Sequence, residues 1–537
     1  MPRIEAPKWS QQALVWLVFA GLIYFPLFLH LDVNPVKAWD EALFALRAYS
    51  LSYYGEYLCE FADLPGAEPA PNTKPPLISL FQAALFRLIG YNSLAMRLPI
   101  ALSGVVIVLA MVWLSKLQTG EYVWGRWSGL VLVTTAGFIH EHVARTGDHD
   151  VPIAMFNLLT MLGAYLYTEE APDRSRGVWL MALAWLGGWL TKGSLALLFV
   201  PAIGLYILFR KKLIPLLKDR QAWMALGVVV LGLALYAFYQ EYSCPGYLDR
   251  SNRYEGMGRL TKSLGGHRHP WFFYLQTWWE WKLTDWLVWL IPAFLLPFIP
   301  SLKSYRNLLL LIWGCAISGT AVISYSGTKL LWYDASILPL IALLVGFSLM
   351  ALHKGLQSLL KAEAFWQQTL IVAALWLTLF ALPYQKIMDK VYQPQDRMYV
   401  DERHPFLLER LEKYYPNERE FAILQTYRSN HVLFYRYVYN HHKGFTISRY
   451  RELEEIKLGD KVMICQPDAD DYFRRYFQYF PIAEYENCTY YRVDGYTEAG
   501  LENLDLEVRF LQEFGLPADS VLQDSLLRHQ LLNPIRD

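Results

Sequence analysis

The sequence predicts a mainly helical protein, a polytopic membrane bundle of about eleven spans followed by a soluble α/β domain at the C-terminal end. Two observations support this. Hydrophobic residues make up 54% of the 537 residues and charged residues only 18%, against roughly 25% charged in an ordinary soluble domain. The apolar residues also gather in runs long enough to cross a bilayer, whereas residues 385–537 are rich in charge and lack such runs.

Composition also excludes several classes of protein. Lys+Arg and Asp+Glu are both 49, so the formal net charge is zero. A nucleic-acid partner is therefore not expected, because such proteins present a basic field. The apolar content is too high for a disordered chain. Five cysteines in a chain of this length do not make a disulfide scaffold.

The predicted spans are the apolar runs near residues 11–31, 95–115, 127–144, 151–167, 177–190, 194–210, 222–241, 283–300, 307–324, 335–352 and 367–384. The first run has no small-residue cleavage site after it, so we interpret it as a retained span. Residues 77–90 form a shorter apolar run with Gln82 and Arg87 inside it. Its helical spacing predicts an amphipathic helix at the membrane surface.

Basic residues in short loops predict the orientation. The strongest cytoplasmic signal is the loop of residues 210–220, and Lys303, Arg306, Lys354 and Lys361 mark two more loops of the same parity. This parity places the N-terminus in the cytoplasm. It places residues 32–94, 145–150, 242–282, 325–334 and 385–537 on the outer side.

The chain therefore divides into a transmembrane module, residues 1–384, and a soluble outer domain, residues 385–537. The module includes the outer loop 32–94 with its surface helices. In the soluble domain, residues 432–439 and 461–465 are expected to be strands and residues 402–414 a helix. Cys465 and Cys488 fall there, and either a disulfide or two buried thiols fits the sequence.

Unusual polar residues gather on the outer face of this topology. The clusters are Trp39-Asp40-Glu41, Asn72-Thr73-Lys74-Pro75-Pro76, Arg145-Thr146-Gly147-Asp148-His149-Asp150, Gly266-His267-Arg268-His269-Pro270-Trp271 and Ser324-Tyr325-Ser326-Gly327-Thr328-Lys329. Each has an ordinary structural explanation: an acidic helix start, an anchor at the lipid headgroups, or a polar turn. His140 and His142 are two residues apart and do not share a helix face, so a metal site there is not expected.

Taken together, these clusters predict one site with several cations and a few carboxylates. Lys74, Arg145, Arg268 and Lys329 can hold a phosphate, with His269 beside them. Asp40, Glu41 or Asp150 can accept a proton from a nucleophile. This combination favours transfer of a group from a lipid phosphate carrier.

Seven short motifs, in order over roughly residues 12–385, resemble those of membrane glycosyltransferases of the GT-C fold. The resemblance is to the superfamily of aminoarabinose transferases and protein O-mannosyltransferases. The motifs are Asp40-Glu41, Lys74-Pro75-Pro76-Leu77, Arg97-Leu98-Pro99, Ala144-Arg145 with Asp150-Val151-Pro152, Thr191-Lys192-Gly193, His269-Pro270-Trp271 and Ser326-Gly327-Thr328-Lys329-Leu330.

The resemblance implies an inverting transfer of a sugar from a polyprenyl-phosphate donor to a hydroxyl of a glycolipid, protein or other glycan. Asp40 would be the base or the carboxylate that positions the acceptor, and Asp150 would support the same site. Lys74, Arg268 and Lys329 would hold the departing phosphate, with Arg145 nearby. Aminoarabinose transferases carry a Glu before Lys-Pro-Pro where this chain has Thr73. A divalent metal is possible but not supported by Thr73, and no cofactor is certain from the sequence.

Two other functions fit a polytopic membrane protein. A transporter or flippase of lipid-linked sugars would place its polar residues near the bilayer midplane on repeated or broken helices. A receptor or assembly protein would not need carboxylates and lysines in several loops. The lack of large inserted loop domains favours a bacterial inner membrane, with residues 385–537 in the periplasm. The role of that domain stays open, with acceptor binding as one interpretation.

Overall fold

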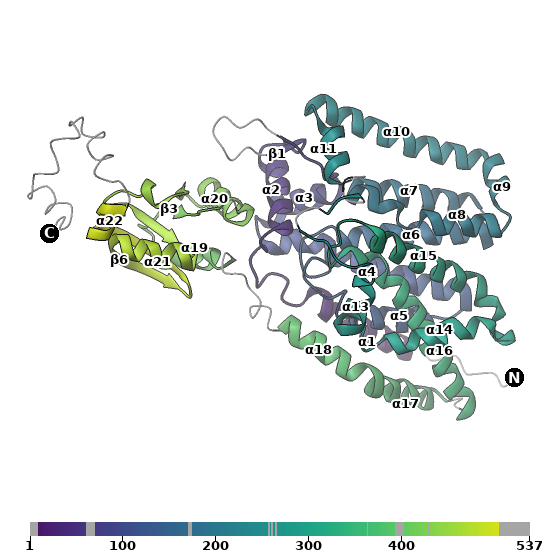
Figure 1. Ribbon diagram of the computed structural model, residues 1–537. Helices are drawn as coiled ribbons and strands as arrows, with labels where there is room; N and C mark the ends of the chain where they lie inside the picture. The colour runs from purple at the N-terminus through teal and green to yellow at the C-terminus, as the bar shows by residue number, and fades with distance from the viewer. Residues whose placement is uncertain are drawn as a thin grey trace, which may run out of the picture. The chain divides into compact units, whose positions relative to one another are not determined.

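The computed structural model describes residues 9–60, 70–169, 174–255, 258, 261–263, 266–361, 364–392, 402–427 and 429–503. The chain divides into two compact units. One, the helical unit, is Met1–Asn34 with Arg47–Pro394. The other, the sheet unit, is Pro35–Leu46 with Gln395–Asp537. Residues 504–537, which end the predicted soluble domain, lie outside the described residues (Figure 1).

The helical unit is built almost entirely of helices. They are α1 (Trp9–Phe28), α3 (Leu77–Ile89), α4 (Ser93–Thr119), α5 (Val123–Val133), α6 (Asp150–Glu169), α7 (Arg174–Lys192), α8 (Val200–Phe209), α9 (Leu213–Lys218), α10 (Arg220–Ser243), α11 (Tyr247–Tyr254), α13 (Phe273–Thr277), α14 (Leu290–Leu295), α15 (Arg306–Tyr325), α16 (Leu338–Leu359), α17 (Phe365–Leu375) and α18 (Ala381–Tyr392). A further helix, α2 (Asp40–Tyr53), begins in the sheet unit and ends in the helical unit. Helix α18 continues through the predicted domain boundary after residue 384.

Eight helices of the described chain are long and apolar enough to cross a membrane, so the prediction of a mainly helical polytopic membrane protein is confirmed. The three other predicted runs are shorter as helices. Helix α5 ends at Val133, and turns continue from there to α6. Residues 194–210 divide into the turn η1 (Gly193–Leu197) and α8. Residues 287–298 form a short helix that contains Pro292 and Pro297.

The predicted helix at residues 77–90 is confirmed as α3, and its two faces differ sharply. Gln82 is fully buried and donates to the carbonyls of Met96 (3.0 Å) and Gly147 (2.8 Å). Leu80, Phe81 and Leu88 lie on the exposed side. An apolar face turned outward and a polar residue turned inward suit a helix that contacts lipid.

A disulfide in the helical unit joins two loops that the sequence predicts to lie on the same side of the membrane. Cys59 pairs with Cys244, which follows α10. It thereby joins the two-residue strand β1 (Cys59–Glu60), paired with β2 (Ala70–Pro71), to the end of that helix. Cys315, inside α15, is a buried free thiol. Disulfides persist in oxidising compartments, and both linked loops belong to the segments that loop charge assigns to the outer side.

The sheet unit is a small α/β domain, as predicted. Its five-stranded sheet has the order β4-β3-β5-β7-β6, with β3 parallel to β4 and β5, and β7 antiparallel to β5 and β6. The strands are β3 (Glu420–Leu424), β4 (Thr446–Tyr450), β5 (Lys461–Ile464), β6 (Phe477–Tyr485) and β7 (Cys488–Tyr496). The helices are α19 (His404–Tyr414), α20 (Asn430–His442), α21 (Pro467–Tyr476) and α22 (Glu498–Asn503).

One secondary-structure prediction in this unit is wrong. Residues 432–439, expected to be a strand from their aromatic and β-branched composition, lie inside α20. The hydroxyl of Ser429 accepts from the Val432 amide at the start of the helix, and Leu433 and Phe434 are buried. Capping and packing therefore outweigh the strand preference of these residues.

The other elements expected in this unit are present. Residues 461–465 contain β5, and residues 402–414 contain α19. Cys465 and Cys488 form a disulfide, which was one of the two open alternatives. It joins the end of β5 to the start of β7, two strands that pair directly.

Glycines allow α6 and α7 to approach closely in the helical unit. A Cβ added at Gly163 would lie 2.5 Å from the Met181 amide nitrogen, and one added at Gly177 would lie 2.5 Å from that of Tyr167. Small residues of this kind let helix backbones touch within membranes. Helix α7 also packs against α10 (Figure 1).

We expect Gly163→Ala to destabilise the protein by about 1–3 kcal/mol, because the new methyl group meets backbone that cannot rotate away. The measurement is the fraction of folded protein left after heating in detergent, followed by size-exclusion chromatography. Gly227→Ala is the matched control, since Gly227 lies in α10 and a Cβ added there would have no atom within 4 Å. Equal melting of the two variants would contradict this account of the α6–α7 contact.

Candidate active site

Lys74 lies in a rigid turn that leads into α3. Its amide donates to the Asn72 side chain (3.1 Å), and the Tyr57 hydroxyl donates to the carbonyls of Lys74 (2.9 Å) and Pro75 (3.0 Å). The Asn72 amide group in turn donates to the Tyr57 carbonyl. The turn therefore fixes the backbone from which the Lys74 side chain extends.

A carboxylate from a distant loop pairs with this lysine. The Lys74 ammonium lies 2.5 Å from Glu255, and the Thr73 hydroxyl donates to the other oxygen of the same carboxylate (3.2 Å). Ser194 holds the Glu255 backbone through a hydrogen bond to its carbonyl (2.8 Å). Sequence analysis missed Glu255, because a single acidic residue in a basic loop carries no motif.

Asp150 and Lys192 form a second ion pair, 2.5 Å long and almost completely buried. Asp150 is the first residue of α6 and Lys192 the last of α7. Each charge therefore lies at the helix end where the macrodipole favours it. Since Ser194 follows Lys192 closely and holds Glu255, the two ion pairs are neighbours.

The lysines of both ion pairs act electrostatically on His149. It is fully buried, and its ring nitrogen is 3.4 Å from the Thr191 carbonyl. Burial, followed by the charge of Lys192 and, more weakly, that of Lys74, lowers the pKa of His149 to about 3. The residue is therefore neutral at physiological pH.

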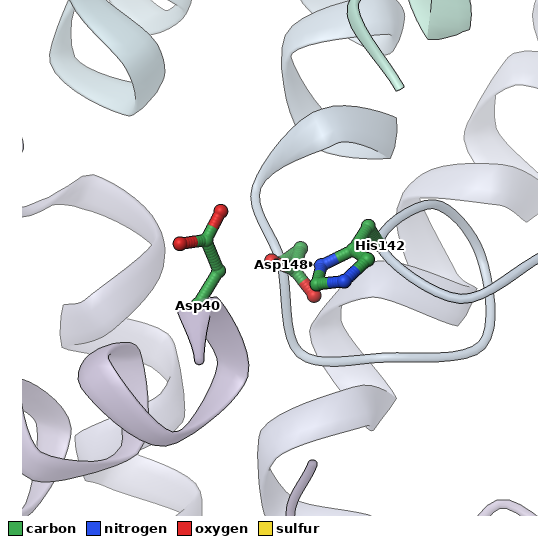
Figure 2. Close-up of side chains that lie close together, drawn as sticks. All are labelled: Asp40, His142 and Asp148. Carbon is green, nitrogen blue, oxygen red and sulfur yellow. Dashed lines mark hydrogen bonds and ion pairs between the residues drawn. The ribbon is translucent and has the colours of Figure 1, made fainter. Parts of the chain in front are cut away.

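The loop between α5 and α6 contains a second histidine with an acidic partner. His142 stacks on Trp332, with ring centroids 4.1 Å apart, and its Nδ1 lies 3.4 Å from Asp148. The Thr146 hydroxyl donates to the other Asp148 oxygen (2.5 Å). Burial alone would raise the pKa of Asp148, but His142 and Thr146 outweigh it and the pKa lies below its ordinary value. Figure 2 shows this pair and also draws Asp40, a residue of the sheet unit.

Arg145 is engaged with backbone. Its guanidinium donates to carbonyls at the end of α1 and just after it, those of Pro26, Leu27, Leu29 and His30. Burial, followed by the charge of Arg97, lowers its pKa to about 10. A cation that satisfies the last carbonyls of a helix stabilises that helix end. Arg145 therefore anchors α1 in the structure.

Lys329 and Arg268 bring two positive charges together. The Lys329 amide donates to the carbonyl of His267 (3.0 Å), and its ammonium donates to the Ser326 carbonyl (2.7 Å). Burial and the nearby charge of Arg268 lower the pKa of Lys329. Arg268 itself is exposed, and His269 stacks on Phe273. Two cations held this close favour an anion between them.

A buried ion pair that sequence analysis missed fixes the Lys329 loop. Lys282 lies 2.8 Å from Asp334, and neither side chain is more than 2% exposed. The Trp278 indole donates to the same carboxylate (2.7 Å). Removing one partner of such a pair costs about 3–5 kcal/mol, because the other charge is left buried.

The two early carboxylates, Asp40 and Glu41, belong to the sheet unit and differ in their contacts. Glu41 is fully buried and accepts from the Lys37 amide (2.7 Å). Asp40 is half-buried and begins α2. Within the described residues its carboxylate makes no hydrogen bond or ion pair. Of the two, Asp40 is the one available to a ligand.

Comparisons with known proteins address the family and the fold. Residues 73–238 match the family described as dolichyl-phosphate-mannose-protein mannosyltransferase. ArnT from Cupriavidus metallidurans bound to undecaprenyl phosphate has a similar structure, with a TM-score of 0.67 and 14% identity over 90% of this chain and 98% of that chain. Its apo state gives a TM-score of 0.62, with the same identity and coverage. The chain has the GT-C fold.

A more distant similarity is to the Archaeoglobus fulgidus oligosaccharyltransferase tethered with an acceptor peptide. The TM-score is 0.50 and the identity 11%, over 82% of this chain and 64% of that chain. No curated protein matches the sequence. The fold and the family match support a glycosyltransferase that uses a lipid-phosphate-linked donor. The chain is an integral membrane protein.

We expect Glu255→Gln to tighten binding of undecaprenyl phosphate by ~3–10-fold. A phosphate that binds Lys74 must replace the carboxylate now paired with it, and a charge-assisted contact near the surface is worth about 1 kcal/mol or slightly more. Native mass spectrometry of the purified protein with added lipid measures the affinity.

Asp249→Asn is the matched control, because it removes a carboxylate that pairs with Arg253 on the exposed face of α11. It should leave the affinity unchanged. If Glu255→Gln instead binds the lipid more weakly than wild type, this would contradict competition between Glu255 and the phosphate for Lys74. It would mean that Glu255 supports the bound lipid.

Proposed function

We propose that this protein transfers a sugar from a polyprenyl-phosphate donor to an acceptor hydroxyl, with inversion at the anomeric carbon. The donor class is supported by the ArnT structure, which is described as bound to undecaprenyl phosphate. Glycolipids, proteins and other glycans are the acceptor classes. The proposed location is a bacterial inner membrane, with the site on the periplasmic face and the N-terminus in the cytoplasm.

The proposal is supported by the contacts of cations that come from loops far apart in the chain. Lys329 and Arg268 lie close enough for one charge to affect the other. Lys74 lies in a prepared turn with a carboxylate as its present partner. Two residues of one stretch of sequence contact both places: Glu255 contacts Lys74, and the Lys262 carbonyl accepts from Thr328 (2.8 Å), the residue before Lys329. Such an array suits a phosphate.

In the proposed reaction the acceptor oxygen attacks the anomeric carbon of the sugar. A bond forms between these two atoms while the bond from the anomeric carbon to the phosphate oxygen breaks. The acceptor proton goes to Asp40, and the electron pair of the broken bond stays on the polyprenyl phosphate. Lys74, Arg268 and Lys329 stabilise the added negative charge. A single displacement needs no covalent intermediate, so one base is sufficient.

Asp150, Glu41 and Arg145 have supporting roles in this proposal. Asp150 orients Lys192, Glu41 accepts a backbone amide just before α2, and Arg145 anchors the end of α1. Each side chain is already engaged, which leaves Asp40 as the base. His269, held against Phe273, lies beside Arg268 and contributes to the phosphate site.

We expect Asp40→Asn to lower kcat by at least ~100-fold, since an amide cannot accept the proton that a general base removes. Binding of undecaprenyl phosphate should change little, because the lysines that hold it are untouched. The assay follows a radiolabelled sugar from polyprenyl-phosphate donors into acceptors in membranes with equal amounts of each variant.

Asp32→Asn is the control, because Asp32 is an exposed carboxylate of the same loop and should leave transfer unchanged. Transfer at the wild-type rate by Asp40→Asn would contradict the assignment of the base. If the wild type transfers no sugar but moves the carrier lipid across proteoliposomes, the flippase interpretation replaces the enzyme.

A further inference from the structure

The segment just before α2 is held by side chains from the far end of the sequence. Three consecutive backbone amides, those of residues 36–38, all donate to side chains. Val36 donates to the Tyr435 hydroxyl (2.9 Å), Lys37 to Glu41 (2.7 Å) and Ala38 to Glu402 (2.8 Å). Tyr435 lies on α20 of the sheet unit, and Glu402 lies just before α19.

Glu402 makes the strongest of these connections. The residue is fully buried. One carboxylate oxygen accepts from the Ala38 amide, and the other lies 3.0 Å from the Lys37 ammonium. Lys37 is buried as well. Burying a lysine and a carboxylate is expensive unless the geometry is well satisfied. This segment, residues 36–40, is therefore held far more firmly than an ordinary surface turn.

The backbone immediately before Asp40 is strained. Trp39 has a φ of +69°, in the left-handed region that residues other than glycine rarely adopt, although its side chain is largely exposed. Strain of this kind persists only where surrounding contacts over-determine the conformation. The contacts at residues 36–38 supply that constraint, and the next residue is Asp40.

We propose that the sheet unit positions Asp40, and that Glu402 is the positioning residue through which it does so. This inference rests on the proposed function, in which Asp40 is the base. It assigns the C-terminal domain a role in the reaction: its buried carboxylate sets the conformation of residues 36–40 and thereby aims the base. Displacement of a reacting group by about 1 Å can cost ~100-fold in rate.

The first test compares Glu402→Ala and the milder Glu402→Gln with wild type in the full-length protein. Hydrogen exchange followed by mass spectrometry reports the amides of residues 36–38 directly. We expect exchange in the peptide that contains them to be at least ~10-fold faster in Glu402→Ala, because the Ala38 amide loses its acceptor. Glu402→Gln keeps an acceptor oxygen but loses the charge facing Lys37, so its exchange should be intermediate.

The same variants are then assayed for sugar transfer. We expect kcat to fall by ~10–100-fold in Glu402→Ala, while the affinity for undecaprenyl phosphate stays within ~2-fold of wild type, because the cations of the helical unit are unchanged. Glu486→Gln is the matched control. It removes the surface ion pair between Glu486 and Arg403, the residue next to Glu402, and should change neither exchange nor kcat.

A double variant tests the strained residue. Glycine adopts a positive φ without strain, so Trp39→Gly should restore part of the kcat lost in Glu402→Ala. Trp39→Gly in the otherwise wild-type protein should not raise kcat. Recovery of this kind is not expected if Glu402 only stabilises the fold.

Several results would overturn the proposal. Unchanged exchange and unchanged kcat in Glu402→Ala would show that the contact does not control residues 36–40. A higher KM with an unchanged kcat would show instead that the sheet unit binds substrate. The exchange measurement needs no sugar transfer. A wild-type protein that transfers no sugar would therefore defeat the proposed function, while exchange would still report on the contact itself.

Discussion

Ion pairs between segments far apart in the sequence, two of them buried and one partly buried, set the geometry of the candidate site. Lys74 pairs with Glu255, Asp150 with Lys192, and Lys282 with Asp334. Charges withdrawn from water are tolerated only when they are paired and hydrogen-bonded, and loss of one partner is costly. Each pair therefore connects two segments at a fixed distance. These pairs therefore fix the conformation of loops between the spans that have no regular secondary structure.

The three ion pairs differ in burial, and this difference matters for the proposed phosphate site. Lys74 has a carboxylate partner that the proposed donor would replace, whereas Asp150 and Asp334 pair with lysines whose side chains are no more than 8% exposed. The partner of Lys74, Glu255, is the less buried carboxylate. It precedes Lys262 in the chain, and the Lys262 carbonyl accepts from Thr328, the residue before Lys329. An incoming anion would exchange one charge pair for another and leave the two structural pairs intact.

Much of the fold follows from the sequence, because span length and charge density are local properties. The C-terminal α/β domain and α3 follow for the same reason. Residues 432–439 were mispredicted because a cap at Ser429 and burial of one helix face outweigh local propensity. Motifs identified Lys74, Asp150 and Lys329. Glu255, the partner of Lys74, and the pair of Lys282 with Asp334 have no sequence signal, since only the fold determines which distant segments meet. Glu402 is a similar case, because its contacts at residues 37 and 38 span more than 360 positions.

The central claim is that Lys74 and Lys329 hold the same lipid phosphate. A double-mutant cycle on undecaprenyl phosphate binding tests it most directly, with Lys74→Met, Lys329→Met and the double variant measured in the same detergent. When two residues contact the same phosphate, the losses of affinity from their substitutions do not add. The account therefore predicts a coupling free energy above ~0.5 kcal/mol. Effects that simply add, within ~0.3 kcal/mol, would mean that the two lysines act at separate places and would contradict the account.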